Sequence, residues 1–212
     1  MFDASADFDP AHNPSSINGG TYSYGYTNTL GGPFSLLPGT FTNGPLAGYS
    51  YPSLPDTAPN VYKNTSDDPF LLLGTIHFEP HQLMLHPGNG GEYAVLRFTA
   101  PVTGTYSYDA TFNAAGGATT DVHVLINSIN LATAGINVNG GGSTADLSSP
   151  SILLSAGDTI DFAVGYGNGS FLFDSTGLFA NVAMVPEPST MVLLAVGVVG
   201  IAGFAARRRA RR

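Results

Sequence analysis

The sequence predicts an all-β fold, an antiparallel β-sandwich of the jelly-roll type, followed by a single C-terminal transmembrane helix. Three observations lead to this prediction. Segments that alternate apolar with polar residues recur about every 8 to 12 residues, as they do in sandwiches and barrels. The 212 residues include 27 glycines and 15 prolines, which favour turns over helices. Near the C-terminus, an uncharged apolar run precedes a cluster of arginines.

The expected strands are taken in order along the chain. Aromatic residues alternate with small ones in the first of them. Strands are predicted at residues 21–26, 71–78, 81–85, 93–98, 105–112, 119–127, 151–154, 157–166 and 178–184, with Phe171 and Phe173 in a further closing strand. The turn at 101–104 predicts a β-hairpin between its two flanking strands, and 151–154 is expected to pair with 157–166 in the same way. A glycine-rich loop is expected between residue 127 and Pro150.

Residues 30–70 are predicted to form a long loop. Prolines and glycines recur throughout this segment, too often for continuous strand pairing. Its aromatic residues argue against disorder, so we expect the loop to pack across a sheet. Because loops of this length in compact domains are often functional, a ligand-binding role is an alternative to a purely structural one.

The charge balance excludes one class of partner. The formal net charge is −8, and Lys63 and Arg97 are the only basic residues outside the C-terminal arginine cluster. An acidic surface repels phosphate backbones, so we predict no nucleic-acid binding, whereas such a surface attracts cations. The absence of cysteine excludes disulfides and a thiol nucleophile.

The sequence predicts no cofactor, and two metal sites stand as alternatives to that prediction. A Ca²⁺ ion would take carboxylate oxygens from Asp158, Asp161 and Asp174. A Zn²⁺ ion would take His77, Glu79 and His81, which point to one side of an extended chain.

Arg97 is the one cation of the sheet region, and a half-buried charge needs a partner. We expect that partner to be Asp109 or Asp121.

We predict that the protein is not an enzyme, because no nucleophile elbow or other motif places a catalytic serine. His123 lies two residues from Asp121 on one strand face, where the pair would supply a base and the group that orients it. The alternative function is therefore a secreted hydrolase of extracellular polymers that requires His77, His81 or His123.

The last segment, residues 185–212, is predicted to be separate from the β-domain at 1–184. It begins with Pro186-Glu187-Pro188 and continues into the uncharged residues 189–206. A helix over 189–206 would be about 27 Å long at ~1.5 Å per residue, close to the ~30 Å hydrocarbon core of a bilayer. The tail at 207–212 carries the basic residues Arg207, Arg208, Arg209, Arg211 and Arg212. By the positive-inside rule these arginines stay in the cytoplasm and the β-domain faces outward.

A Pro-Glu-Pro motif, a short apolar helix and a terminal arginine cluster, in this order, resemble the PEP-CTERM sorting signal of bacterial exported proteins. The resemblance implies that an exosortase cleaves near Pro186, Glu187 and Pro188. The protein would then be anchored in the membrane only transiently, and afterwards released or attached at the cell surface. Residues 1–7 contain neither a basic region nor an apolar run, so we expect an export signal upstream of Met1.

Residues 97–106 and 154–162 resemble a hairpin and a late strand of extracellular jelly-roll modules, among them carbohydrate-binding ones. The function that follows from both resemblances is that of a non-catalytic protein of the cell envelope or extracellular matrix. Its expected partners are the exosortase, the membrane before processing, and exopolysaccharide.

Overall fold

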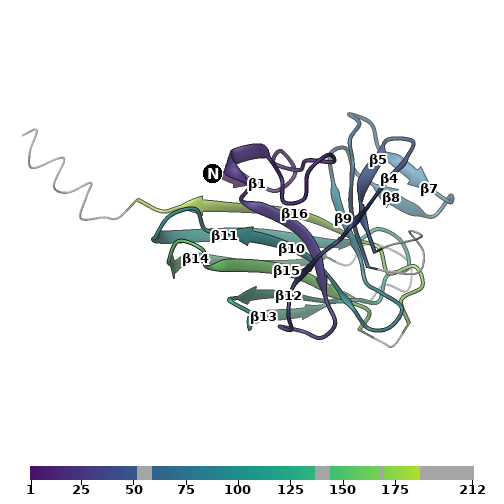
Figure 1. The fold of residues 1–212 in the computed structure, drawn as a ribbon. Helices are drawn as coiled ribbons and strands as arrows, with labels where there is room; N and C mark the ends of the chain where they lie inside the picture. Colours follow the sequence, from purple (N-terminus) through teal and green to yellow (C-terminus); the bar gives the residue numbers. More distant parts are fainter. Residues whose placement is uncertain (52–58, 137–143, 168–169, 187–212) are drawn as a thin grey trace, which may run out of the picture.

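The computed structural model describes residues 1–51, 59–136, 144–167 and 170–186, which form two large antiparallel β-sheets and one small one (Figure 1). The all-β antiparallel prediction is therefore confirmed. The helix expected at 189–206 lies outside the described residues, as do Glu187, Pro188 and the terminal arginines. Within the described ranges, no helix is long and apolar enough to cross a membrane.

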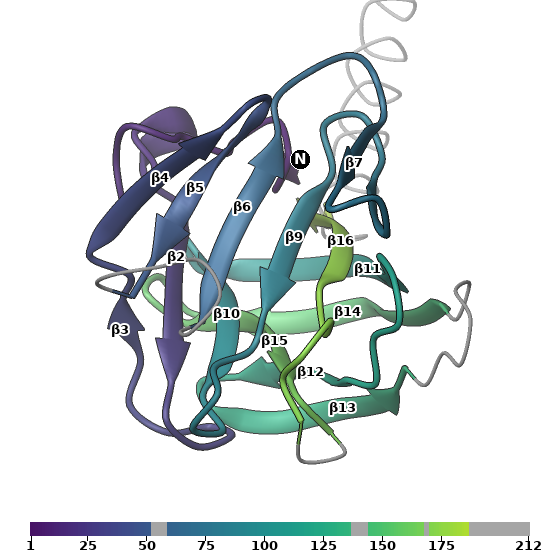
Figure 2. The same ribbon diagram turned by 90° about the vertical axis from the view of Figure 1, so that its right-hand side faces the viewer.

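The first sheet has eight strands. Their order is β14 (Thr144–Leu154), β11 (Gly104–Ala114), β16 (Thr176–Met184), β9 (Leu83–His86), β6 (Asn60–Asn64), β5 (Leu46–Ser50) and β4 (Gly39–Asn43), with β1 (Phe2–Asp3) on β16. The second sheet has six strands, in the order β13 (Ile129–Gly135), β12 (Asp121–Ile126), β15 (Thr159–Gly165), β10 (Tyr93–Thr99), β2 (Tyr22–Thr27) and β3 (Ser35–Leu36). A small hairpin of β7 (Phe70–Leu72) and β8 (Ile76–Phe78) lies beside β9 (Figure 2).

The main core lies between the two large sheets, since its buried residues come from both. On β10, the predicted inward face of Ala94, Leu96 and Phe98 is fully buried. The outward face is covered as well, because Val95 packs in a second cluster against Leu30 and Phe34. This central strand is therefore covered on both faces, although its outward face also carries Arg97.

The two predicted strand pairs around residues 101–104 and 154–157 are wrong. Strand β10 belongs to the second sheet and β11 to the first, so the turn between them carries the chain across the sandwich. The same is true of β14 and β15. Turn residues specify that the chain reverses but not which neighbour it pairs with, and here burial of alternate residues against the facing sheet decides the partner.

The loop expected at 30–70 is also a misassignment, because β3, β4, β5 and β6 lie within it. Its prolines fall mainly between strands. Pro45 occupies the turn from β4 to β5, and Pro59 directly precedes β6. Proline at a strand boundary removes no hydrogen bond from the ladder, so its abundance does not exclude a sheet.

The glycine-rich loop expected before Pro150 is likewise replaced in part by β13 and β14. Asn127 and Ser128 both have positive φ angles, 49° and 68°, in the tight turn that joins β12 to β13. Pro150 lies within β14, where the register shifts between the pairs Tyr106–Ile152 and Tyr108–Ser149. Proline is accepted there because β14 is an edge strand with a bulge.

The N-terminal segment is part of the sandwich. The Phe8 ring lies 4.9 Å from that of Tyr24, which stacks at 5.1 Å on Tyr49 from the facing sheet. The Tyr49 hydroxyl donates to the carbonyl oxygen of Asp9 at 2.5 Å. Burial acts to raise the pKa of Asp9, but hydrogen bonds from Ser16, Ala11 and His12 outweigh it and hold the pKa well below its usual value. The N-terminal segment therefore contacts both sheets.

Candidate functional site

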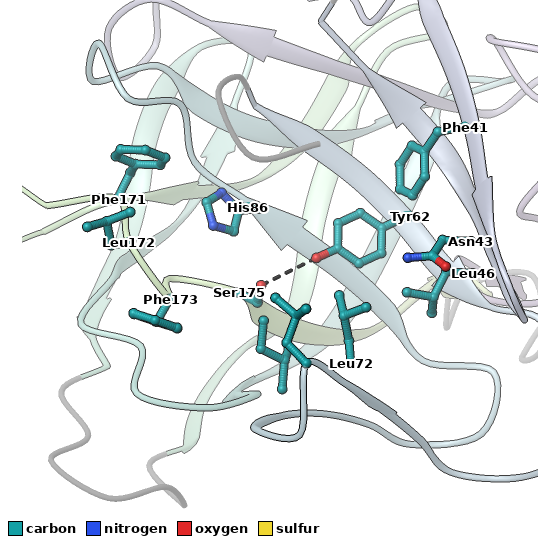
Figure 3. Close-up of a pocket in the computed structure, with 12 residues that line it drawn as sticks. Phe41, Asn43, Leu46, Tyr62, Leu72, His86, Phe171, Leu172, Phe173 and Ser175 are labelled. Carbon is teal, nitrogen blue, oxygen red and sulfur yellow. Dashed lines mark hydrogen bonds between the residues drawn. The ribbon is translucent and has the colours of Figure 1, made fainter. Parts of the chain in front are cut away.

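A pocket of about 380 Å³ lies on the outer face of the first sheet (Figure 3). Strands β4, β5, β6 and β9 form its floor, while the β7–β8 hairpin and the segment before β16 form its walls. The lining residues are Phe41, Asn43, Leu46, Tyr62, Leu72, Leu73, Ile76, His86, Phe171, Leu172, Phe173 and Ser175. Alternation along β6 places Tyr62 here because its neighbour Val61 points into the main core.

Tyr62 is held on three sides. Its ring makes an edge contact with Phe41 at 5.4 Å and a tilted contact with Phe78 at 5.6 Å. Its hydroxyl lies 3.3 Å from the hydroxyl of Ser175, which lies in the wall formed by the segment before β16 (Figure 3). The ring cannot rotate without breaking these contacts, so the polar end of Tyr62 has a defined place in the pocket.

His86 is oriented by the backbone. Its Nδ1 atom lies 2.8 Å from the carbonyl oxygen of Pro87. A carbonyl only accepts hydrogen bonds, so Nδ1 must carry a proton. The imidazole also meets the ring of Phe171 edge-on at 6.0 Å. Both side chains line the pocket.

The lining is mainly apolar and contains no Asp, Glu, Lys or Arg. Its polar groups are the amide of Asn43, the hydroxyls of Tyr62 and Ser175 and the imidazole of His86. An apolar wall with a few convergent polar groups, in a volume within about 300–1,000 Å³, is the common composition of small-molecule sites. The pocket is therefore the candidate binding site.

The carboxylates expected to bind calcium are not brought together. Asp158 accepts a hydrogen bond from Ser155 N at 2.7 Å in the turn between β14 and β15. Asp161 pairs with Arg97, and Asp174 accepts from Thr119 N at 2.7 Å. In the described ranges, no group of three or more His, Asp or Glu side chains is arranged to hold a metal ion.

Asp161 is also the partner that Arg97 needed, in place of the expected Asp109 or Asp121. Two bonds of 2.7 Å join the guanidinium and the carboxylate, and the two residues lie directly opposite each other on β10 and β15. Phe34 covers the guanidinium, whose central carbon lies 4.0 Å from the ring centroid. Asp109 lies in the first sheet, whereas Asp121 binds His123. Strand pairing, which was not predicted correctly, decided the partner.

The zinc grouping of His77, Glu79 and His81 is not formed either. The extended conformation ends at Phe78, and Gln82 N donates to Glu79 O at 3.2 Å in the following turn. His81 has a φ angle of 58° and binds Asp67 at 2.8 Å. The side chains therefore do not share a side as they would in a continuous strand.

A chain of three polar side chains lies on the outer face of the second sheet. His123 Nε2 lies 2.6 Å from Asp121 Oδ2, and His123 Nδ1 lies 2.9 Å from the hydroxyl of Thr133. Sequence analysis identified His123 and Asp121 but missed Thr133, which is the cross-strand partner of His123 on β13. A hydroxyl, an imidazole and a carboxylate in this order can act as nucleophile, base and orienting group.

Asp121 is held in its charged form. Burial acts to raise its pKa, but hydrogen bonds from His123, Gly167 N and Tyr93 outweigh this effect and lower the pKa. Burial and the neighbouring Asp121 raise the pKa of Tyr93 to about 12, so its hydroxyl keeps its proton and donates to Asp121 at 3.2 Å. The charged carboxylate can therefore accept a hydrogen bond from a protonated nitrogen of His123.

Solved structures with some likeness include a family 35 carbohydrate-binding module from Clostridium thermocellum, at 14% identity over 49% of this chain and 78% of that chain, with a TM-score of 0.34. A PA14 sugar-binding domain from an RTX adhesin shows 10% identity over 44% and 46% of the two chains, with a TM-score of 0.29. Pika GITRL shows 19% identity over 44% and 79%, with a TM-score of 0.29. Likenesses this weak transfer neither a ligand nor an activity. A comparison with curated protein sequences gives no match.

The C-terminal segment follows directly from the sandwich. Val185 N donates to Thr105 O at 2.8 Å beyond the end of β16, and the next residue, Pro186, is exposed. Residues 185–209 match the family model described as the PEP-CTERM protein-sorting motif. The chain therefore carries a PEP-CTERM protein-sorting motif directly after its β-sandwich.

Proposed function

We propose that this chain is a non-catalytic protein of the bacterial cell envelope or extracellular matrix, sorted and cleaved by an exosortase. Its β-sandwich associates with exopolysaccharide after export. The observation that carries the proposal is the PEP-CTERM match at residues 185–209.

The junction between sandwich and motif supports this function. Strand β16 pairs with β11, β9 and β1, and the hydrogen bond of Val185 to Thr105 is the last one described between the main chain and the sheet. Pro186 is exposed immediately after it. A processing enzyme therefore reaches the motif without opening the sandwich, and cleavage there leaves every described strand in the product.

Cells with and without the exosortase should differ in where this protein is found. In cells with the exosortase, we expect a shortened product at the surface or in the medium. In cells without it, we expect the full-length chain in the membrane fraction. Immunoblotting of cell fractions measures both. The double variant Pro186→Ala/Pro188→Ala should behave like the exosortase deletion. Pro45→Ala, in the turn between β4 and β5 and three strands from β16 in the sheet order, should be processed normally. An uncut chain in both strains would contradict the proposal.

A secreted hydrolase is the second candidate, and the Thr133–His123–Asp121 chain is the observation that favours it. Under the first proposal, we expect no turnover of ester or glycoside substrates above the buffer rate. Turnover that disappears in Thr133→Val and in His123→Gln would establish the second candidate instead. Thr111→Val is the matched control, since Thr111 is also a strand threonine whose hydroxyl bonds a side chain on the neighbouring strand, Asp146, at 2.7 Å.

A further inference from the structure

Two bulky residues of the pocket adopt a backbone conformation that is unfavourable for both of them. Leu73 has a φ angle of 52° and is 76% exposed, and Phe173 has a φ angle of 65° and is 58% exposed. Positive φ is unfavourable for large L-residues, and such outliers cluster at ligand-binding sites. Both residues line the same pocket although they come from separate parts of the chain. The backbone conformation does not favour a large apolar residue at either position, and neither side chain belongs to a hydrophobic core cluster.

Leu73 occupies the tip of the β7–β8 hairpin. Thr75 N donates to Leu72 O at 3.2 Å, and both central residues, Leu73 and Gly74, have positive φ angles. This is the turn in which Asn-Gly is strongly preferred, because asparagine tolerates the left-handed region. Leucine is therefore a poor choice for the turn, and its side chain instead forms part of the pocket wall.

Phe173 is presented by an anchored turn. Residues 171–174 reverse the chain, with Asp174 N donating to Phe171 O at 3.3 Å. The fully buried Asp174 fixes this turn to the sandwich through Thr119 N at 2.7 Å. Leu172 and Phe173 both lie at this wall (Figure 3). Two turns from separate parts of the chain thus place apolar side chains at the pocket beside its four polar groups.

We infer that this pocket binds an uncharged sugar unit that carries apolar substituents, such as O-acetyl or 6-deoxy groups, within a polysaccharide. The inference rests on the proposed association with exopolysaccharide and assigns the site and the ligand class. The turn residues and Phe41 offer contact to methyl and C–H groups. Asn43, Tyr62, His86 and Ser175 offer hydrogen bonds to hydroxyl groups. A fatty acyl chain would place only methylene groups against these four side chains and would use none of their capacity for hydrogen bonds to a ligand.

Charge selects against acidic polymers. No Asp, Glu, Lys or Arg side chain lines the pocket, so no permanent positive charge there would pair with a uronic acid. The protein around it has a net charge of −8, which repels polyanions, and most of its positive charge lies in the C-terminal arginine cluster. Neither the uncharged lining nor the net negative charge of the protein disfavours binding of a neutral polymer.

Leu73→Asn separates binding from stability. Asparagine suits the turn better than leucine, so the variant should melt at the same temperature as the wild type or higher. Its retention by an acetylated neutral glucomannan, measured by affinity electrophoresis of the full chain in detergent, should fall at least about tenfold. Val102→Asn is the matched control: it replaces a 47% exposed aliphatic residue in a turn of the sandwich, and both properties should stay unchanged.

Three polymers define the ligand. We expect retention to be strongest on acetylated glucomannan, weaker on the same polymer after alkaline deacetylation, and absent on polygalacturonate. Tyr62→Phe keeps the ring contacts and should weaken retention on all neutral polymers. Equal retention on the three polymers, unchanged retention in Leu73→Asn, or displacement by a fatty acid would overturn the inference. Exosortase is absent from this assay, so a failure of sorting and a failure of sugar binding are recorded separately.

Discussion

Phe98→Ala is expected to lower the free energy of unfolding by about 3–5 kcal/mol, the range for removing a large aromatic side chain from a close-packed core. Phe98 is fully buried at the centre of the sandwich. Its ring lies 5.2 Å from that of Phe2, 5.5 Å from Tyr22 and 5.9 Å from Tyr106. These neighbours come from β1, β2 and β11, so the truncation removes contacts between the two sheets. Urea unfolding followed by tyrosine fluorescence measures the change.

Phe179→Ala is the matched control for this truncation. Phe179 lies on β16 with 41% of its surface exposed, so its loss should cost less than about 1 kcal/mol. Equal losses for the two variants would mean that the sheets do not pack through Phe98.

Asp161→Asn is expected to destabilise the protein by about 3–5 kcal/mol, because it leaves a guanidinium without its counter-charge in a largely buried site. The side chains of Arg97 and Asp161 are 19% and 4% exposed, and two bonds of 2.7 Å join them. The loss should persist in high salt, since buried pairs are screened much less than exposed ones. Urea unfolding at low and high NaCl tests both points.

The double variant Arg97→Met/Asp161→Leu should recover much of that stability. Replacing both members of a buried pair by apolar residues of similar size is often neutral, whereas removing one member leaves an unpaired charge. If Asp161→Asn alone lowers the free energy of unfolding by less than about 1 kcal/mol, the pair behaves like an exposed surface salt bridge.

The local pattern of this sequence was sufficient for several strands, but not for β3 to β6, for β13, or for the strand expected at Phe171 and Phe173, where the chain turns. Alternation predicted the inward face of β10, and the aromatic alternation at residues 21–26 predicted β2 with a one-residue difference at each end. Prolines misled the prediction at residues 30–70, because a proline between strands and a proline in a loop look alike without knowledge of the partner strand. Pairing was predicted from turns alone, and it was wrong wherever a turn crosses between sheets.

For the candidate sites, too, the sequence identified residues that lie close together in the chain but not their distant partners. His123 and Asp121 lie two apart on one strand and were identified together, whereas Thr133 reaches them only through the β12–β13 register. The pocket draws on four strands, a hairpin and a turn far along the chain. The length of the loop expected at 30–70 suggested a ligand-binding role there, but no spacing in the sequence joins Phe41 and Tyr62 to His86 and Phe173.

The sequence by itself determined the all-β class, the acidic character of the β-domain and the sorting motif at its end, because composition, alternation and a contiguous motif are local properties. Only the tertiary structure decided which strands are neighbours, that Arg97 binds Asp161, and that Leu73 and Phe173 line one pocket. The physical reason is that these contacts join residues far apart in the chain. They form when alternate faces are buried between two sheets, and a one-dimensional pattern does not specify that pairing.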